Sequence, residues 1–207
     1  MKASATFLAL ALFAVGCATT EAPPPAEPAM AGDEMMEISP DEMMAMMVEA
    51  GTPGENHTNL TALVGNWDVD YEIWMEPGSP PSKAKATSTY RSILGGRYVL
   101  EEFHSEFNGA PFEGMLILGY DNVRQQFQSL WIDNFSTGFH IQRGQMDESG
   151  TKRLRGKAFD LMTPKGRPMR SELHQVSDDH FTMQMFDSVP GGPEWVSMSF
   201  EYKRAAG

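Results

Sequence analysis

The residues with the widest chemical use in this chain are five histidines and one cysteine. Imidazole is the commonest metal ligand, and zinc needs three or four ligands brought to one point. No two of these histidines stand at the HxH or HxxxH spacing of a metal-binding pair. They are His57, His104, His140, His174 and His180. We therefore predict no metal site, and the single cysteine excludes an internal disulfide, a cysteine-rich zinc site and a CxxC redox centre.

Nucleophile and nucleotide-binding motifs are also absent from the sequence. There is no GxSxG elbow, no P-loop and no GxGxxG, so we predict that the protein is not an enzyme. A strand over 127–133 would place Ser129, Trp131 and Asp133 on one face. A hydroxyl and a carboxylate beside an aromatic ring could bind the polar head group of a ligand. Alternatively, these residues pack at a rim, with Asp133 bonded to Arg97 or Arg91 as a structural clamp.

The charge balance argues against a nucleic-acid partner. Sixteen Lys and Arg residues stand against 28 Asp and Glu residues, which gives a formal net charge of -12. No basic cluster is present that could release counterions from phosphates. Much of the acidity belongs to residues 18–50, which contain eight acidic residues and no Lys or Arg.

The N-terminus has the organisation of a secretion signal. An apolar run over 7–15 has the length of a signal-peptide core and is too short to span a bilayer. It ends at Ala14-Val15-Gly16-Cys17, which resembles the lipobox of a bacterial lipoprotein. We predict a signal peptide over 1–16, membrane anchoring through acylated Cys17 and, because Ala18 follows, an outer-membrane protein facing the periplasm. The alternative is an ordinary secreted protein cut nearby.

Residues 17–50 form a predicted tether that is rich in proline and methionine. Pro23-Pro24-Pro25 and the run of acidic residues favour an extended, disordered chain. Thioethers suit Cu(I), but no histidine accompanies these methionines. The favoured interpretation is a short amphipathic helix over 40–50, with Ser39 as its N-cap, whose methionines cover the domain or bind a protein partner. The methionines are Met30, Met35, Met36, Met43, Met44, Met46 and Met47.

The remaining residues, 51–207, alternate between apolar and polar side chains in short runs separated by turn signals. This period of two is typical of strands. A short helix is expected over 59–63. Ten strands without a long helix favour an all-β, up-and-down antiparallel barrel, with an open sandwich as the rival. The expected strands are 65–73, 83–94, 97–107, 112–120, 127–133, 138–146, 153–161, 169–176, 181–187 and 195–202.

Several motifs in this domain resemble those of known barrels. Gly65-Asn66-Trp67 is similar to the G-x-W signature of lipocalin-like (calycin) barrels, in which the tryptophan closes the barrel floor. Over residues 51–207 the chain resembles the DUF1579 family of uncharacterised bacterial proteins. The resemblance implies a lipocalin-like fold and no catalytic residues. It rests on Gly51-Thr52-Pro53-Gly54, His57, Leu63-Val64-Gly65-Asn66-Trp67, Trp74-Met75-Glu76-Pro77-Gly78, Ile93-Leu94-Gly95-Gly96-Arg97, Pro111-Phe112-Glu113-Gly114, Leu118-Gly119-Tyr120-Asp121 and Trp131-Ile132-Asp133.

A barrel of this width leaves room for one small ligand. We expect a lipid-anchored barrel that binds a hydrophobic or amphipathic molecule. Trp67, Tyr71 and Trp131 would line the pocket, and Asp133, His104 or Arg97 would meet the polar end of the ligand. The first alternative is an envelope structural or interaction protein that docks a partner through its methionines. The second is a haem protein similar to nitrobindin, with an inward-facing His104 or His140 as the iron ligand.

Overall fold

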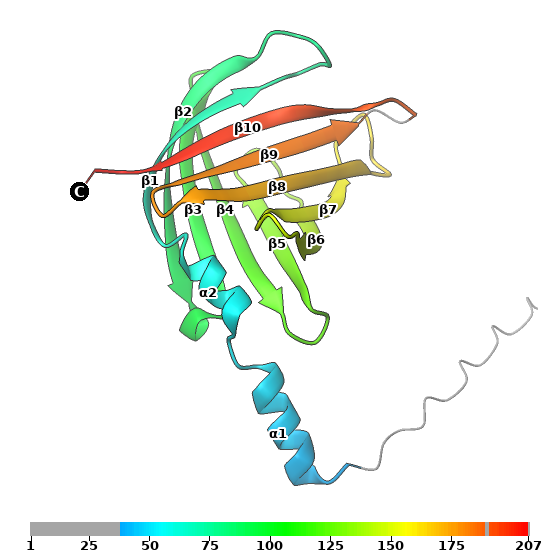
Figure 1. Cartoon of the computed structure of the whole chain (residues 1–207). Helices are drawn as coiled ribbons and strands as arrows, with labels where there is room; N and C mark the ends of the chain where they lie inside the picture. The colour runs from blue at the N-terminus through cyan, green and yellow to red at the C-terminus, as the bar shows by residue number, and fades with distance from the viewer. Residues whose placement is uncertain (1–37, 189–190, 207) are drawn as a thin grey trace, which may run out of the picture. The chain divides into compact units, whose positions relative to one another are not determined.

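Ten antiparallel strands make up the domain. The computed structural model describes residues 38–188 and 191–206. Each strand pairs with the next in sequence, and β1 also pairs with β10, so the sheet closes on itself (Figure 1). The predicted ten-strand barrel is confirmed, and the open sandwich is excluded. The strands are β1 (Gly65–Ile73), β2 (Ser82–Ile93), β3 (Tyr98–Phe107), β4 (Ala110–Asp121), β5 (Gln126–Asp133), β6 (His140–Met146), β7 (Lys152–Ala158), β8 (Arg167–Ser177), β9 (His180–Ser188) and β10 (Glu194–Arg204).

The strand ends follow local turn chemistry. Asn108 and Gly109 both have positive φ, 51° and 79°, which is the conformation that a two-residue hairpin between β3 and β4 requires. Strand β7 ends at Ala158, three residues before the expected end at position 161. The reason is a turn centred on Asp160, whose Oδ1 accepts the backbone N–H groups of Met162 and Thr163. The expected strand boundaries are otherwise close to the observed ones.

In the described ranges, two α-helices and a 3-10 turn, η1 (Leu94–Gly96), accompany the strands. Helix α1 (Pro40–Ala50) matches the helix expected over 40–50, and none of its residues is buried. Helix α2 (Glu55–Thr61) begins four residues before the expected position. The earlier start follows from His57, whose Nδ1 accepts the backbone N–H of Gly54 at 3.0 Å and so caps the first turn. No helix among the described residues has the length and apolar character needed to cross a membrane.

Helix α2 lies at one end of the barrel (Figure 1). Buried side chains close this end. Trp67 is 1% exposed, and its Nε1 donates to the carbonyl oxygen of Leu63 at 2.8 Å. The guanidinium of Arg204 lies 4.3 Å from the centre of the Trp67 ring, a cation–π contact. Arg204 also donates to the carbonyl oxygens of Val64 and Asp178, at 3.1 and 2.6 Å. These contacts fix the first and last strands of the barrel to each other.

Gly65 is a position at this end where a side chain would be strained. Its φ is 142°, and a Cβ atom there would overlap Nη1 of Arg204. We expect Gly65→Ala to lower the free energy of unfolding by about 1–3 kcal/mol, measured by urea denaturation. Gly138→Ala is the matched control, because a Cβ at Gly138 meets nothing within 4 Å, and we expect a change within about 0.5 kcal/mol. Equal effects at the two positions would contradict this account.

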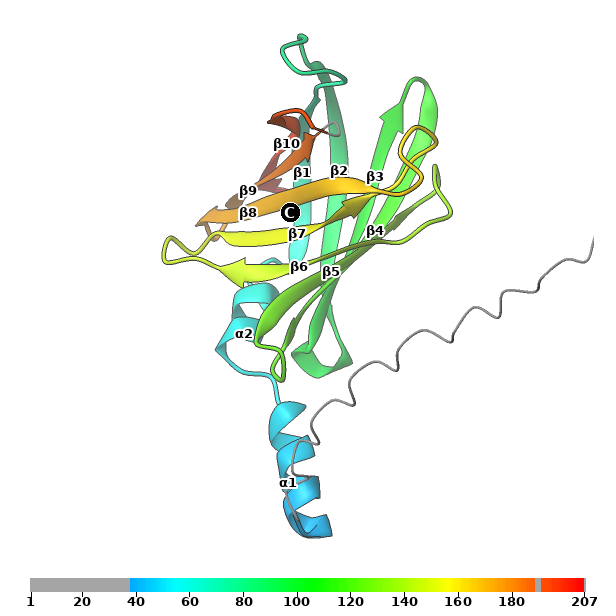
Figure 2. The ribbon, with the colours of Figure 1, turned by 90° about the vertical axis from the view of Figure 1, so that its right-hand side faces the viewer.

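The predicted signal peptide over 1–16, the lipidation of Cys17 and most of the predicted tether lie outside the described residues. They therefore stay predictions. The described part of the tether is Ile38, Ser39 and helix α1. Figure 2 shows the barrel from the side, with the loops that follow β1, β3, β5, β7 and β9 at the end away from α2.

Candidate ligand-binding cavity

The end of the barrel away from α2 contains a cavity of about 560 Å³. Its lining comes from inward-facing positions of all strands except β2, and from the loops at the open end. A volume of this size lies within the usual range for small-molecule pockets, about 300–1,000 Å³. The inner strand positions alternate with exposed ones, so each strand contributes every second side chain to the lining.

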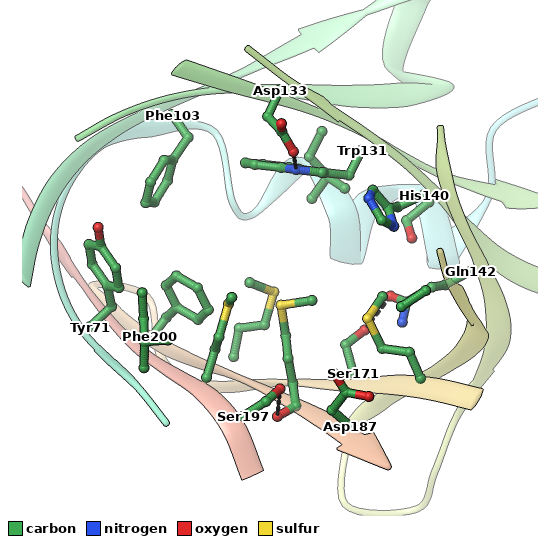
Figure 3. Close-up of a pocket in the computed structure, with 18 of the residues that line it drawn as sticks. Tyr71, Phe103, Trp131, Asp133, His140, Gln142, Ser171, Asp187, Ser197 and Phe200 are labelled. Carbon is green, nitrogen blue, oxygen red and sulfur yellow. Dashed lines mark hydrogen bonds between the residues drawn. The ribbon is translucent and has the colours of Figure 1, made fainter. Parts of the chain in front are cut away.

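One wall of the cavity is aromatic. Tyr71 and Phe200 stack with ring centres 5.4 Å apart, and Phe103 packs edge-on against Trp131 at 6.1 Å. The Tyr71 hydroxyl is satisfied by Ser105 Oγ at 2.8 Å. Figure 3 shows Tyr71, Phe103 and Phe200 together on one side of the cavity, with His140 across from them. Flexible methionines add to the apolar lining, and Met183, Met185 and Met198 among them also pack against the core.

A carboxyl group lies among the buried residues of the cavity lining. Glu101 is 1% exposed, and its Oε1 accepts hydrogen bonds from the Ser88 hydroxyl at 2.7 Å and the Tyr202 hydroxyl at 3.2 Å. Burial raises the pKa of Glu101 above its ordinary value, although these hydrogen bonds act in the opposite direction. The folded protein therefore favours the uncharged carboxyl.

The raised pKa of Glu101 predicts how the stability of the protein depends on pH. The folded chain holds the Glu101 proton more tightly than the unfolded chain does. The native protein therefore loses stability as pH rises from about 4.3, the ordinary carboxyl value, through the folded pKa. Glu101→Gln cannot ionise, so its free energy of unfolding should rise relative to that of the native protein over this interval. Urea denaturation of both proteins from pH 4 to 8 measures the difference, and a difference that is constant with pH would contradict the assignment.

The wall formed by β5, β6 and β8 carries polar groups. Ser129 and Gln142 are direct partners across β5 and β6. The Ser171 hydroxyl donates to Oε1 of Gln142 at 2.7 Å. Gly156 lies opposite Gln142 on β7 and has no side chain to cover the amide. Figure 3 shows His140, Gln142 and Ser171 along this side of the cavity.

Among the described residues that line the cavity, Arg167 is the one arginine, and carboxylates at the open end engage it. Arg167 donates from Nε and Nη2 to the two carboxylate oxygens of Asp187, at 2.6 and 2.7 Å, and it also pairs with Asp160. The Asp187 carboxylate raises the pKa of Arg167 further above its usual value. Backbone and side-chain donors of Thr163, together with Arg167, lower the pKa of Asp160 to about 2. Asp160 is therefore ionised at neutral pH.

Three of the predicted site residues line the cavity: Tyr71, Trp131 and Asp133. Trp131 Nε1 donates to Asp133 Oδ2 at 2.8 Å, and Gly114 leaves the space that the indole occupies. The backbone N–H of Phe135 donates to the other oxygen of Asp133. Asp133 therefore bonds to Trp131 and to the backbone of Phe135, and not to Arg97 or Arg91 as the alternative prediction had it.

The other three predicted residues do not line this cavity. Trp67 lies in the closed end, where the resemblance to lipocalin-like barrels places it. Arg97 follows η1, and its Nη1 donates to the carbonyl oxygen of Leu94 at 3.2 Å. His104 is exposed on the outer face of β3, because Phe103 and Ser105 face inward. His104 and His140 therefore do not meet.

Sequence reasoning missed Glu101, Gln142 and Arg167. The sequence Leu100-Glu101-Glu102-Phe103 carries an acid on both faces of the strand, so its pattern alone does not say which acid is buried. Arg167 follows a turn whose geometry depends on Asp160. Among the described residues, no group of three or more His, Cys, Asp or Glu side chains is arranged to hold a metal ion.

Comparison with known proteins agrees with this architecture. A comparison with curated proteins found no match. The crystal structure of Rv2717c from M. tuberculosis superposes with a TM-score of 0.55 at 13% sequence identity, covering 75% of this chain and 100% of that one. At this identity the likeness shows the fold alone. The profile of the family described as "Protein of unknown function (DUF1579)" matches residues 52–204. The chain therefore belongs to the DUF1579 family.

Proposed function

We propose that this barrel binds one small hydrophobic or amphipathic molecule in the cavity, without catalysing a reaction. The observation that carries the proposal is the cavity of about 560 Å³ with a largely apolar lining. Burial of apolar surface contributes about 25 cal/mol per Å², so an apolar ligand gains affinity throughout such a space. The partly buried Met183, Met185 and Met198 can adapt to its shape.

Apolar side chains at the opening support the same proposal. Met75, Phe135 and Phe159 belong to the cavity lining, yet they are 74%, 54% and 53% exposed. Large exposed apolar residues at the edge of a pocket are common where apolar ligands or surfaces are bound. A lipid-anchored location at the outer membrane, as the sequence predicts, would place the cavity near a source of apolar molecules.

Mass spectrometry and a fluorescence titration test the proposal. The full chain, purified without detergent, is compared by native and denaturing mass spectrometry, and an added mass that is lost on denaturation identifies a resident ligand. N-phenyl-1-naphthylamine, a neutral apolar fluorophore, is then titrated into the chain. We expect saturable binding with increased emission. The absence of both a resident mass and saturable probe binding would overturn the proposal.

Helix α1 favours a second candidate function, the docking of a protein partner. Met43, Met44, Met46 and Met47 are 48%, 59%, 51% and 63% exposed. Such a flexible apolar surface suits protein recognition. Capture of a partner by the native chain, and loss of capture when these four methionines are changed to Gln, would favour this function. Unchanged capture would exclude the helix as the docking site.

Haem is a further candidate because of His140. This histidine lines the cavity, and its Nδ1 is buried without a hydrogen-bond partner in the part of the chain that the structure describes. The three aspartates of the lining, Asp133, Asp160 and Asp187, disfavour the carboxylates of a haem. Addition of haem should give a Soret band that His140→Ala abolishes and His104→Ala retains if His140 is the iron ligand. Without such a band, or if the band survives in His140→Ala, His140 is not a haem ligand.

A further inference from the structure

Three side chains in the cavity lining have a buried nitrogen with no hydrogen-bond partner among the described residues. They are His140 Nδ1, Gln142 Nε2 and Trp195 Nε1. Among the described residues, Tyr90 is the one other side chain with a buried N or O atom in this state. Buried polar groups are nearly always hydrogen-bonded. Their concentration in the cavity lining therefore indicates that something in the cavity satisfies them.

The three atoms share a hydrogen-bonding role. The amide nitrogen of Gln142 and the indole nitrogen of Trp195 are donors and cannot accept, while an imidazole nitrogen donates in one of its tautomers. Gln142 is 7% exposed, and its oxygen already accepts from Ser171 at 2.7 Å. This hydrogen bond orients the amide, so the Gln142 Nε2–H group still lacks an acceptor. A ligand that suits this wall offers an acceptor oxygen.

The charges of the lining determine which acceptor fits. Arg167 is the one Lys or Arg among the described lining residues, and it is engaged by Asp187, Asp160 and Thr163. Asp133 adds another carboxylate. Burial raises the pKa of Glu101, which disfavours its charged form and leaves no cation there for a ligand. A ligand carboxylate would lose its hydration in this cavity and find no free cation, whereas a neutral carbonyl loses much less.

We infer that the cavity selects an apolar molecule with a neutral hydrogen-bond acceptor, such as a ketone or ester carbonyl, which binds the Gln142 amide, and that it rejects the matching carboxylate. This inference rests on the proposed function and names its ligand class. It places the specificity on β6, opposite the aromatic wall of Tyr71, Phe103 and Phe200 (Figure 3).

The test uses two probes of equal carbon number, 2-undecanone and undecanoate, each competing with N-phenyl-1-naphthylamine for the full chain at pH 7.5. We expect the ketone to displace the fluorophore at a concentration lower by about tenfold or more, because a carboxylate is costly to bury beside other carboxylates. Equal displacement, or stronger displacement by undecanoate, would overturn the inference while the fluorophore still binds.

A substitution separates the role of Gln142 from general apolar binding. Gln142→Leu should weaken displacement by 2-undecanone about tenfold more than it changes the affinity for the fluorophore, since the donor to the ketone is lost. Gln145→Leu is the control on the same strand, because Gln145 is exposed. Unchanged ketone displacement by Gln142→Leu would overturn the role of this amide. If the native chain does not bind the fluorophore at all, the proposed function itself is overturned, and the inference with it.

Discussion

Trp67→Ala is expected to lower the free energy of unfolding by about 3–5 kcal/mol, the usual cost of removing a large buried aromatic side chain. Trp67 is 1% exposed and packs edge-on against Phe181 with ring centres 4.7 Å apart. The substitution also leaves the carbonyl of Leu63 without its donor and removes the surface beneath the Arg204 guanidinium. Urea denaturation, followed by far-ultraviolet circular dichroism, measures the loss.

Phe139→Ala provides the control for Trp67. Phe139 is also aromatic but 65% exposed, so its removal should change the free energy of unfolding by no more than about 0.5 kcal/mol. A loss below about 1 kcal/mol in Trp67→Ala would contradict the assignment of this residue to the closure of the barrel. Binding of an apolar probe by any folded Trp67→Ala protein should persist, because Trp67 does not line the cavity.

Met185→Trp is expected to weaken binding of N-phenyl-1-naphthylamine by about tenfold or more, since the larger ring occupies space that the ligand needs. Met185 belongs to the lining, and its partners are Ser171 of β8 on one side and Met198 of β10 on the other. Methionine is flexible, so its site accepts a larger apolar group at modest cost to folding. Fluorescence titration measures the affinity.

Gln184→Trp is the matched control for this substitution. Gln184 is adjacent on β9 and is absent from the cavity lining, because successive side chains point to opposite faces of a strand. The control should bind the fluorophore as the native chain does. If Met185→Trp is folded and binds equally well, the fluorophore does not occupy this cavity.

The hairpin signals in the sequence were sufficient to predict the number and order of the strands. Alternation of apolar and polar residues, as in Trp67, Val69 and Tyr71, is a local property that survives in the folded chain. The Asn108-Gly109 turn has the positive φ angles that these residue types adopt most easily. Each of these signals depends on a few neighbouring residues, so tertiary contacts did not alter them.

Which face of a strand points into the barrel was harder to predict than the position of the strand in the sequence. In β3, reading His104 as an inward residue requires Leu100 and Glu102 to face inward, whereas the structure places Val99, Glu101 and Phe103 there. Both readings bury one acid and several apolar residues. A shift of one residue exchanges the two faces, and only the pairing of β3 with β2 and β4 selects between them.

The sequence by itself thus determined the family, the barrel class and the closing role of Trp67, because these depend on local periodicity and a short motif. It also pointed to Tyr71, Trp131 and Asp133, which line the cavity. The tertiary structure alone decided that Glu101 and Gln142 join them and that Arg97 and His104 do not. Those residues come from strands distant in sequence, and their burial, their hydrogen bonds and the space between them arise only when the sheet closes.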